Sequence, residues 1–352
     1  MTSITINFFG DLNLGHQIIK DPFKNIKKNL LGADLNVCNL EGPIIKDYKT
    51  GYIRKSASIC TLDNHLKFLY NNNINCVCLA NNHIMDYQKD GLEETILKSE
   101  NNEIHYFGAG NNLEKSLTPA IYKVNNVKIG FIGFSWDVIQ SINAKKNNAG
   151  TAPLYKKIIL NTIKKNKQLF DFLVVSLHFN YEFEQWPLPS QRKMCHEIID
   201  NGADIIIGHH PHIFQGVEIY KNKLIAYSMG NFFFSNIISK TGKELREWSK
   251  ETKHSIMLKI KLLQDLSYKH EVVPICTDKD WQLYFLKNEE RNKLLEQIEY
   301  LSLPFYKDDI NYRSFWKKNR KRFLPDHFTD VFIIQKIAII IYKIIEKISN
   351  RK

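Results

Sequence analysis

The chain has 352 residues, 43% of them hydrophobic, which suits one large or two ordinary folded domains and excludes a disordered chain. Its 49 lysine and arginine residues outnumber its 37 acidic residues and give a formal charge of +12. We therefore expect an anionic partner, such as a polymer, a phosphorylated substrate or acidic lipid. Much of the excess lies in residues 313–323 and at the very end of the chain, so the charge alone does not indicate specific nucleic-acid binding.

The first residues enter an alternating strand pattern at once, without the basic and long apolar segments of a secretory signal. The six cysteines form no CxxC pair and lie mostly in apolar runs, at positions 38, 60, 76, 78, 195 and 276. We interpret them as reduced core residues. These features predict a cytoplasmic protein, with peripheral contact at the inner membrane face left open.

Strand-like runs and helical patterns alternate along the first 275 residues. The predicted strands are ITINFFG (4–10), DLNVCNL (34–40), INCVCLA (74–80), EIHYFG (103–108), VKIGFIGF (127–134), FDFLVVSL (170–177) and ADIIIG (203–208). Helices are predicted at 87–100, 155–168 and 189–201. This alternation is typical of the α/β class. Two polar turns, at 124–127 and 220–224, join strand-like runs as hairpins and therefore predict mixed sheets.

The pattern changes near residue 280, where the strands end and a basic helical tail begins. We therefore predict a main domain at 1–280 and a basic helical extension at 281–352. Within 331–348, isoleucines recur at helical spacing, at positions 334, 337, 341, 344, 345 and 348. The spacing predicts an amphipathic helix, which lysines make too polar to span a membrane. This helix docks either on the protein's own core or on a membrane surface.

Polar side chains with metal-binding chemistry follow several of these predicted strands. They are Asp11, Asn13, Glu41, Asn82, His83, His178, His209, His210 and His212. Each of them alone could be a turn residue, a cap or an ordinary histidine. Because ligands bind beyond the carboxyl ends of strands in α/β sheets, we expect the loops to meet at one rim.

Carboxylate, amide and imidazole groups without thiolate favour Mn²⁺, Fe or Zn²⁺ over Ca²⁺ or a soft copper site. We therefore predict one or two divalent ions. Two such ions would lower the pKa of a shared water and hold the oxygens of a displaced group, which is hydrolytic chemistry.

Five segments, taken in order, resemble the CapA family of poly-γ-glutamate capsule synthesis proteins, which is similar in fold to the calcineurin-like metallophosphoesterases. They are GDLNLG (10–15), NLEGPI (39–44), LANNHIMDYQKDGLEET (79–95), SLHFNYEF (176–183) and the stretch from Gly202 to Ser235. The resemblance runs from about residue 4 to 235. It implies a four-layer α-β-β-α sandwich of two mixed sheets with the site at one sheet edge, here followed by the C-terminal helical extension.

The resemblance also implies roles for individual residues. Asp11 and His212 occupy the positions of ligands of a first metal. His178 and His210 occupy the positions of ligands of a second metal, and Asn82 occupies the position of an amide ligand. Glu41 replaces the usual bridging aspartate, and Asn13 replaces a histidine, which weakens the first site. His83 resembles the acid that contacts the leaving group. We expect His210 and His212 to serve two metals, because residues two apart in extended backbone point the same way.

Further polar residues of these segments are expected to hold substrate or to orient ligands, with a local turn or hairpin hydrogen bond as the alternative. They are His209, Glu182, Glu218 and Asn231. The resemblance predicts a capsule or exopolymer synthesis protein that acts as a metal-dependent hydrolase or transferase on an anionic polymer or phosphoester. Two alternatives are a phosphoesterase for small metabolites and a non-catalytic subunit that holds polymer.

Overall fold

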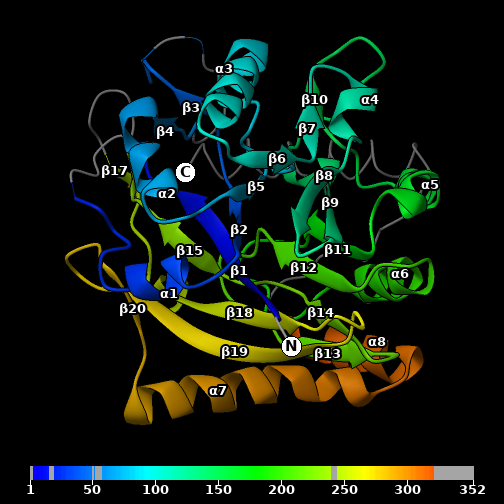
Figure 1. Cartoon of the computed structure of the whole chain (residues 1–352). Coiled ribbons are helices and arrows are strands. Elements are labelled where there is room, and N and C mark those ends of the chain that lie inside the picture. Colours follow the sequence, from blue (N-terminus) through cyan, green and yellow to red (C-terminus); the bar gives the residue numbers. More distant parts are fainter. Residues whose placement is uncertain (1–2, 16–19, 50, 52–57, 239–243, 321–352) are drawn as a thin grey trace, which may run out of the picture.

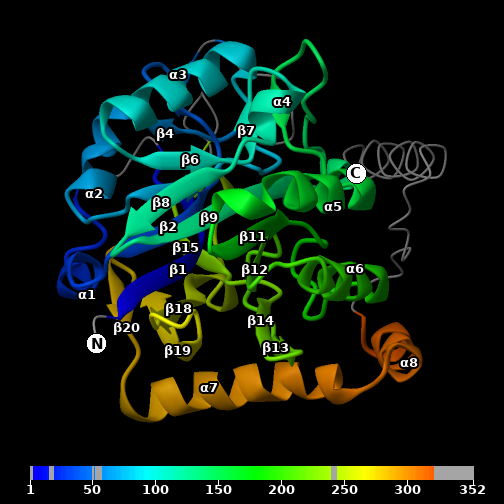
Figure 2. The same cartoon turned by 45° about the vertical axis from the view of Figure 1, so that its right-hand side comes forward.

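The structure is a computed structural model that describes residues 3–15, 20–49, 51, 58–238 and 244–320. The amphipathic helix predicted at 331–348 lies outside these residues. Two large mixed sheets pack face to face with helices on their outer sides (Figures 1 and 2). The predicted α/β class with two mixed sheets is confirmed.

The first sheet combines a parallel half with an antiparallel half. Its strands, in order across the sheet, are β20 (Leu283–Phe285), β19 (Tyr268–Thr277), β18 (His254–Leu262), β1 (Ile4–Asn13), β2 (Leu35–Leu40), β5 (Cys76–Cys78) and β6 (His105–Phe107). Strands β1, β2, β5 and β6 run parallel, whereas β18, β19 and β20 are antiparallel to their neighbours. A further strand, β15 (Asn231–Phe234), pairs in parallel with the end of β1.

The second sheet is parallel at its centre and antiparallel at both edges. Its strands are, in order, β13 (Val217–Tyr220), β14 (Lys223–Ala226), β12 (Ile205–His209), β11 (Phe172–His178), β9 (Val127–Ser135) and β8 (Ala120–Val124). Both predicted hairpins are present, as β8–β9 and β13–β14. Each has a two-residue turn with positive φ, at Asn125 and Asn126 and at Lys221 and Asn222, which matches the twist of the flanking strands.

Side-chain alternation along the strands divides the core into layers. In β1, Ile4, Ile6 and Phe8 pack in the cluster shared with the second sheet, whereas Phe9 and Leu12 pack in another cluster. That second cluster includes residues of α1 (Lys27–Leu31), α2 (Lys67–Tyr70) and α3 (Gln88–Asn101). Helices α5 (Lys156–Asn166) and α6 (Pro189–Asp200) cover the second sheet (Figure 2). Helices, sheet, sheet and helices form the four expected layers.

Several further elements are short. The strands are β3 (Ile44–Ile45), β4 (Thr61–Leu62), β7 (Ala109–Gly110), β10 (Gly150–Thr151), β16 (Ile237–Ile238) and β17 (Glu244–Arg246). One further α-helix is α4 (Leu113–Ser116), and the 3-10 helices are η1 (Asp63–His65), η2 (Asp137–Ile139), η3 (Lys167–Leu169), η4 (Glu251–Lys253) and η5 (Leu303–Tyr306). All six cysteines are buried free thiols, as predicted.

Residues 281–320 stay in contact with both sheets. Strand β20 extends the first sheet, and α7 (Asn288–Ser302) then runs along β19 and β13 (Figure 1). Helix α8 (Asp309–Asn319) packs on α6, where the hydroxyl of Tyr312 donates to the carbonyl of Pro187 at 2.7 Å. The domain boundary at 280 remains a prediction.

Candidate metal centre

Asp11 lies at the end of β1, where the strand passes very close to another backbone segment. A Cβ atom at Gly10 would overlap the carbonyl oxygen of Gly230, and the backbone N–H of Asp11 donates to that oxygen at 2.9 Å. The Asp11 side chain is fully buried, and its carboxylate accepts from the amide of Asn39 at 2.8 Å and from the backbone N–H of His210 at 3.2 Å. The strand pairing thus fixes the direction of this carboxylate.

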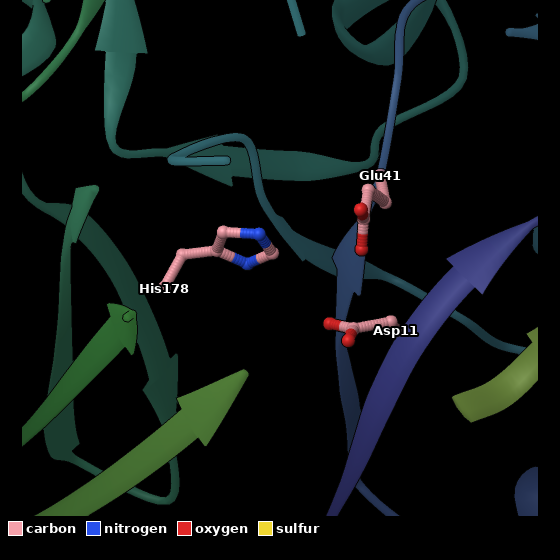
Figure 3. A group of neighbouring side chains, drawn as sticks. All are labelled: Asp11, Glu41 and His178. Carbon is pink, nitrogen blue, oxygen red and sulfur yellow. The ribbon is translucent and has the colours of Figure 1, made fainter. Parts of the chain in front are cut away.

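Glu41 follows β2 and is also fully buried. Asp11, Glu41 and His178 each offer one potential ligand atom, and these atoms lie within 4.8 Å of one another. Figure 3 shows the two carboxylates facing His178, which comes from the end of β11 in the other sheet. The edges of both sheets therefore supply this group, as expected from the strand-end positions of the three residues.

His178 is held as a neutral imidazole. Its Nε2 lies 3.0 Å from Oδ1 of Asn82, and its Nδ1 lies 3.3 Å from the amide nitrogen of Asn39. Burial and the neighbouring His210 hold the pKa of His178 well below its usual value. Neutral imidazole is the form that binds metals. A separation of about 3 Å is also what two ligands of one ion have when each lies about 2.1 Å from it.

The histidine-rich loop begins where β12 ends at His209. The β11–β12 register places His209 beside His178, and its Nδ1 lies 3.3 Å from Oδ1 of Asp11. His210 and His212 have φ values of 98° and 59°, so the loop is not extended. The predicted extended backbone, with both side chains pointing the same way, is therefore wrong. The two rings nevertheless lie near each other, with centroids 5.8 Å apart.

His210 is buried against His178, with ring centroids 5.0 Å apart, and burial lowers its pKa to about 3. Its Nδ1 has no hydrogen-bond partner within the described part of the chain. A buried, neutral nitrogen of this kind fits a metal ligand, because leaving such an atom without any partner is costly.

His212 is oriented by Asn231. Nδ1 of His212 lies 2.9 Å from Oδ1 of Asn231, whose own amide donates to the carbonyl of Thr252 at 3.2 Å. The proton of His212 is therefore on Nδ1, and the other nitrogen, Nε2, lies 3.9 Å from the carboxylate of Glu41. Burial lowers the pKa of His212 as well. Asn231 is thus placed to orient this candidate ligand, and its two possible roles stay predictions.

The electrostatics suit a dication. Burial would raise the pKa of Asp11, but the hydrogen bond from His209 holds that pKa well below its usual range. An ionised carboxylate, a second buried carboxylate and neutral imidazoles together form a donor set for Mn²⁺, Fe or Zn²⁺. These residues fit the predicted ion chemically.

Asn13 has different partners from those predicted. Its amide donates to the backbone carbonyl of Glu41 at 2.6 Å, and its Oδ1 accepts from the backbone N–H of Gly15 at 3.0 Å. These bonds close the turn after β1 and hold the backbone of Glu41. They favour the turn role over a direct metal contact, which remains a prediction.

His83 is paired with a residue that the sequence reasoning missed. Its Nδ1 lies 2.6 Å from Oδ2 of Asp86, which is fully buried and also accepts from the backbone N–H of Ile59 at 3.0 Å. The signal was present in the segment NNHIMD, where the two residues are three positions apart. The His83 side chain itself is 15% exposed.

Glu182 contacts a second residue that the sequence did not suggest. Its carboxylate lies 3.1 Å from the guanidinium of Arg246, which is 64 positions further along the chain. Burial would raise the pKa of Glu182, but the imidazoles of His212 and His210, together with Arg246, hold it below its ordinary value. Glu182 therefore lies beside the cluster, and its role in holding substrate or orienting ligands stays a prediction. Only the fold brings Arg246 to it.

Glu218 is placed elsewhere, in a buried ionic network. Its described partners are the guanidinium of Arg192 at 2.6 Å, Nε2 of His196 at 3.0 Å and the hydroxyl of Tyr227. Arg192 also reaches Asp309 of α8 at 3.2 Å. These contacts link α6, β13 and α8, and none of these partners belongs to the metal cluster.

The fold and the cluster define an α/β protein with a candidate metal centre at the joined edges of its two sheets. Residues 5–236 match the family described as bacterial capsule synthesis protein PGA_cap, and the chain belongs to this family. The predicted resemblance is thereby confirmed.

Two relatives carry related names. The PGA biosynthesis protein CapA of Bacillus subtilis (strain 168) is 30% identical over 283 residues, which cover 77% of this chain and 71% of the relative. The capsule biosynthesis protein CapA of Bacillus anthracis is 29% identical over 245 residues, which cover 66% of this chain and 60% of the relative. The match thus covers less than two thirds of the second relative.

Solved structures show a more distant likeness. The NAD nucleotidase (NadN) of Haemophilus influenzae aligns over 90% of this chain and 60% of its own, with a TM-score of 0.43 and 13% identity. A 5'-nucleotidase precursor from Thermus thermophilus aligns over 84% of this chain and 58% of its own, with a TM-score of 0.45 and 13% identity. At scores this low the likeness carries no argument about activity.

Proposed function

We propose that this protein is a metal-dependent hydrolase or transferase that acts on an anionic polymer during capsule synthesis. The observation that supports the proposal most is the buried group of Asp11, Glu41 and His178, whose potential ligand atoms lie within 4.8 Å of one another. The relatives named for PGA and capsule biosynthesis supply the polymer context.

Asp11, Glu41 and His178 would hold the metal, with Asn82, His210 and His212 as further ligands. A bound Mn²⁺, Fe or Zn²⁺ supplies an acidified water and a positive charge that polarises an oxygen of the substrate. Asn39 and the backbone N–H of His210 donate hydrogen bonds to Asp11, and Asn231 accepts one from His212, and these bonds hold the donor set in place. Such support raises ligand basicity and preserves orientation.

His83 would act as the proton donor to the leaving group. Asp86 accepts a hydrogen bond from Nδ1–H of His83. This leaves Nε2 as the nitrogen that exchanges a proton with substrate. The partial exposure of the His83 side chain, in contrast to the fully buried Asp86, suits a residue that meets substrate.

The test combines elemental analysis with turnover. Protein purified without added metal is analysed for bound ions and assayed on poly-γ-glutamate and on a generic phosphodiester, before and after chelation. We expect bound metal and chelator-sensitive turnover, and the His83→Asn variant should lose turnover while His270→Gln, a change at an exposed histidine of β19, should not. Protein that carries no metal and whose melting temperature is unchanged by Mn²⁺ or Zn²⁺ would refute the catalytic proposal.

A non-catalytic role in holding polymer is the second candidate, and the formal charge of +12 favours it. Polymer binding that is insensitive to chelator, without turnover, would establish this role instead. Faster turnover of a small phosphorylated metabolite than of any polymer would identify a phosphoesterase.

The place of action is also a proposal. Within the described residues, no helix combines the length and hydropathy needed to cross a bilayer. We propose that the chain acts in the cytoplasm, with contact to the inner membrane face through residues 331–348. Liposome flotation of the full chain and of a version ending at 328 would test the contact, and equal flotation of the two would exclude it.

A further inference from the structure

A partly exposed ion pair between Arg246 and Glu182 lies beside the buried cluster. Arg246, the last residue of β17, contacts Glu182 at 3.1 Å, and the two side chains are 37% and 32% exposed. The guanidinium of Arg246 lies over the rings of Phe183 and Trp248, 5.6 Å and 5.4 Å from their centroids.

The same group of residues reaches the metal-site histidines. The ring of Trp248 packs 4.9 Å from the ring of His212, and that of Phe183 lies 6.5 Å from it. Glu182 interacts electrostatically with His83, His210 and His212. A ligand bound at the cluster would therefore have Arg246 and Glu182 as neighbours.

We propose that Arg246 recognises an anionic group of the substrate next to the group that reacts, and that Glu182 is its internal counter-ion when no substrate is bound. This assignment rests on the proposed function, because it places the substrate at the metal centre. It names the substrate class as a chain with anionic groups at regular spacing, such as γ-linked glutamate.

A guanidinium binds a carboxylate through two parallel hydrogen bonds, and two aromatic rings hold the guanidinium of Arg246 in place. An ion pair that is one-third exposed stabilises the fold only slightly, so exchanging Glu182 for a substrate carboxylate is not costly. A chain with several carboxylates can place one of them at Arg246 and another group at the metal centre, so Arg246 would select for a chain.

The test measures binding to the metal-loaded protein by calorimetry, with γ-linked triglutamate and inorganic phosphate as separate probes. We expect Arg246→Ala to weaken triglutamate binding by about tenfold or more and phosphate binding by less than about twofold. Glu182→Gln should tighten triglutamate binding, because it removes the competing carboxylate. Arg291→Ala is the matched control, since Arg291 is 39% exposed and also ion-paired, with Glu271 at 4.0 Å.

A purely structural role for the pair predicts a different result, in which Arg246→Ala and Glu182→Gln both lower the melting temperature and weaken both probes equally. That result, or unchanged triglutamate binding by Arg246→Ala, would overturn the proposal.

The catalytic proposal and the assignment of Arg246 can fail separately. If the protein shows no turnover but Arg246→Ala still weakens triglutamate binding, the catalytic proposal fails and the assignment of Arg246 stands. If turnover is present and Arg246→Ala binds normally, the assignment of Arg246 fails alone.

Discussion

His83 and Asp86 are joined by a short hydrogen bond, with 2.6 Å between Nδ1 of the imidazole and Oδ2 of the carboxylate. The carboxylate is fully buried, and the imidazole is not. This pairing keeps a proton on Nδ1 of His83 and leaves Nε2 as the nitrogen that can exchange a proton with substrate. It also makes the role of His83 open to a test that leaves the histidine itself in place.

The Asp86→Asn variant should keep its metal and lose activity. An amide cannot stabilise the positively charged imidazole as a carboxylate does, so we expect a decrease in kcat of about tenfold to a hundredfold. Metal content and turnover are measured on the same preparation. Asp90→Asn, at an exposed aspartate in the first turn of α3, is the control. Equal activity of the two variants would remove Asp86 from the mechanism.

His210 provides a test of metal binding that does not depend on activity. The His210→Ala variant should carry less metal per chain after equal dialysis, because it removes a buried neutral donor at the cluster. His196→Ala is a control at a histidine that contacts Glu218 instead. Wild-type metal content in His210→Ala would show that this side chain is not a ligand.

The sequence predicted that Asp11, Glu41 and His178 follow strands. Pairing of β1 with β2 brings the first two to one edge, and packing of the second sheet on the first brings the end of β11 to them. Their role as metal ligands stays a prediction. The sequence could not predict what depends on backbone geometry or distant pairing. The positive φ values of His210 and His212 have no local signal, since neither residue is a glycine. Arg246 meets Glu182 only through the fold. The aspartate at position 86 was visible three residues after His83 but was not singled out.

Asn13 should matter for stability more than for metal chemistry. In Asn13→Asp the acceptor for the backbone N–H of Gly15 remains, but the donor to the carbonyl of Glu41 is lost. A lost buried hydrogen bond and an added buried charge should lower the free energy of unfolding by about 1–3 kcal/mol. Urea unfolding of metal-free protein measures this change. Unchanged stability together with reduced metal content would instead favour the direct ligand role.

A substitution at Glu218 can distinguish a structural role from a substrate-binding role. Its side chain and that of Arg192 are 6% and 5% exposed, and removing one partner leaves the other charge buried. Glu218→Gln should therefore lower the free energy of unfolding by about 3 kcal/mol or more, with unchanged metal content. Denaturant unfolding and elemental analysis provide the two readouts. Full stability combined with weakened substrate binding would restore the role first predicted for Glu218.

The metal-free protein should lose stability in acid through the buried His210. Burial lowers the pKa of His210 from 6.5 to about 3, so the folded state keeps this imidazole neutral while the unfolded state takes up a proton below about pH 6.5. Stability contributed by this difference is full above pH 6.5 and is lost as pH falls toward 3. The slope per histidine is about 1.4 kcal/mol per pH unit well below the unfolded pKa. His210→Gln, which cannot titrate, should therefore have a shallower dependence of unfolding free energy on pH between about 6 and 4. Denaturant titrations at several pH values compare this variant with wild type and with His270→Gln. Parallel curves for wild type and His210→Gln would mean that the His210 ring is protonated, or reached by solvent, in the metal-free fold.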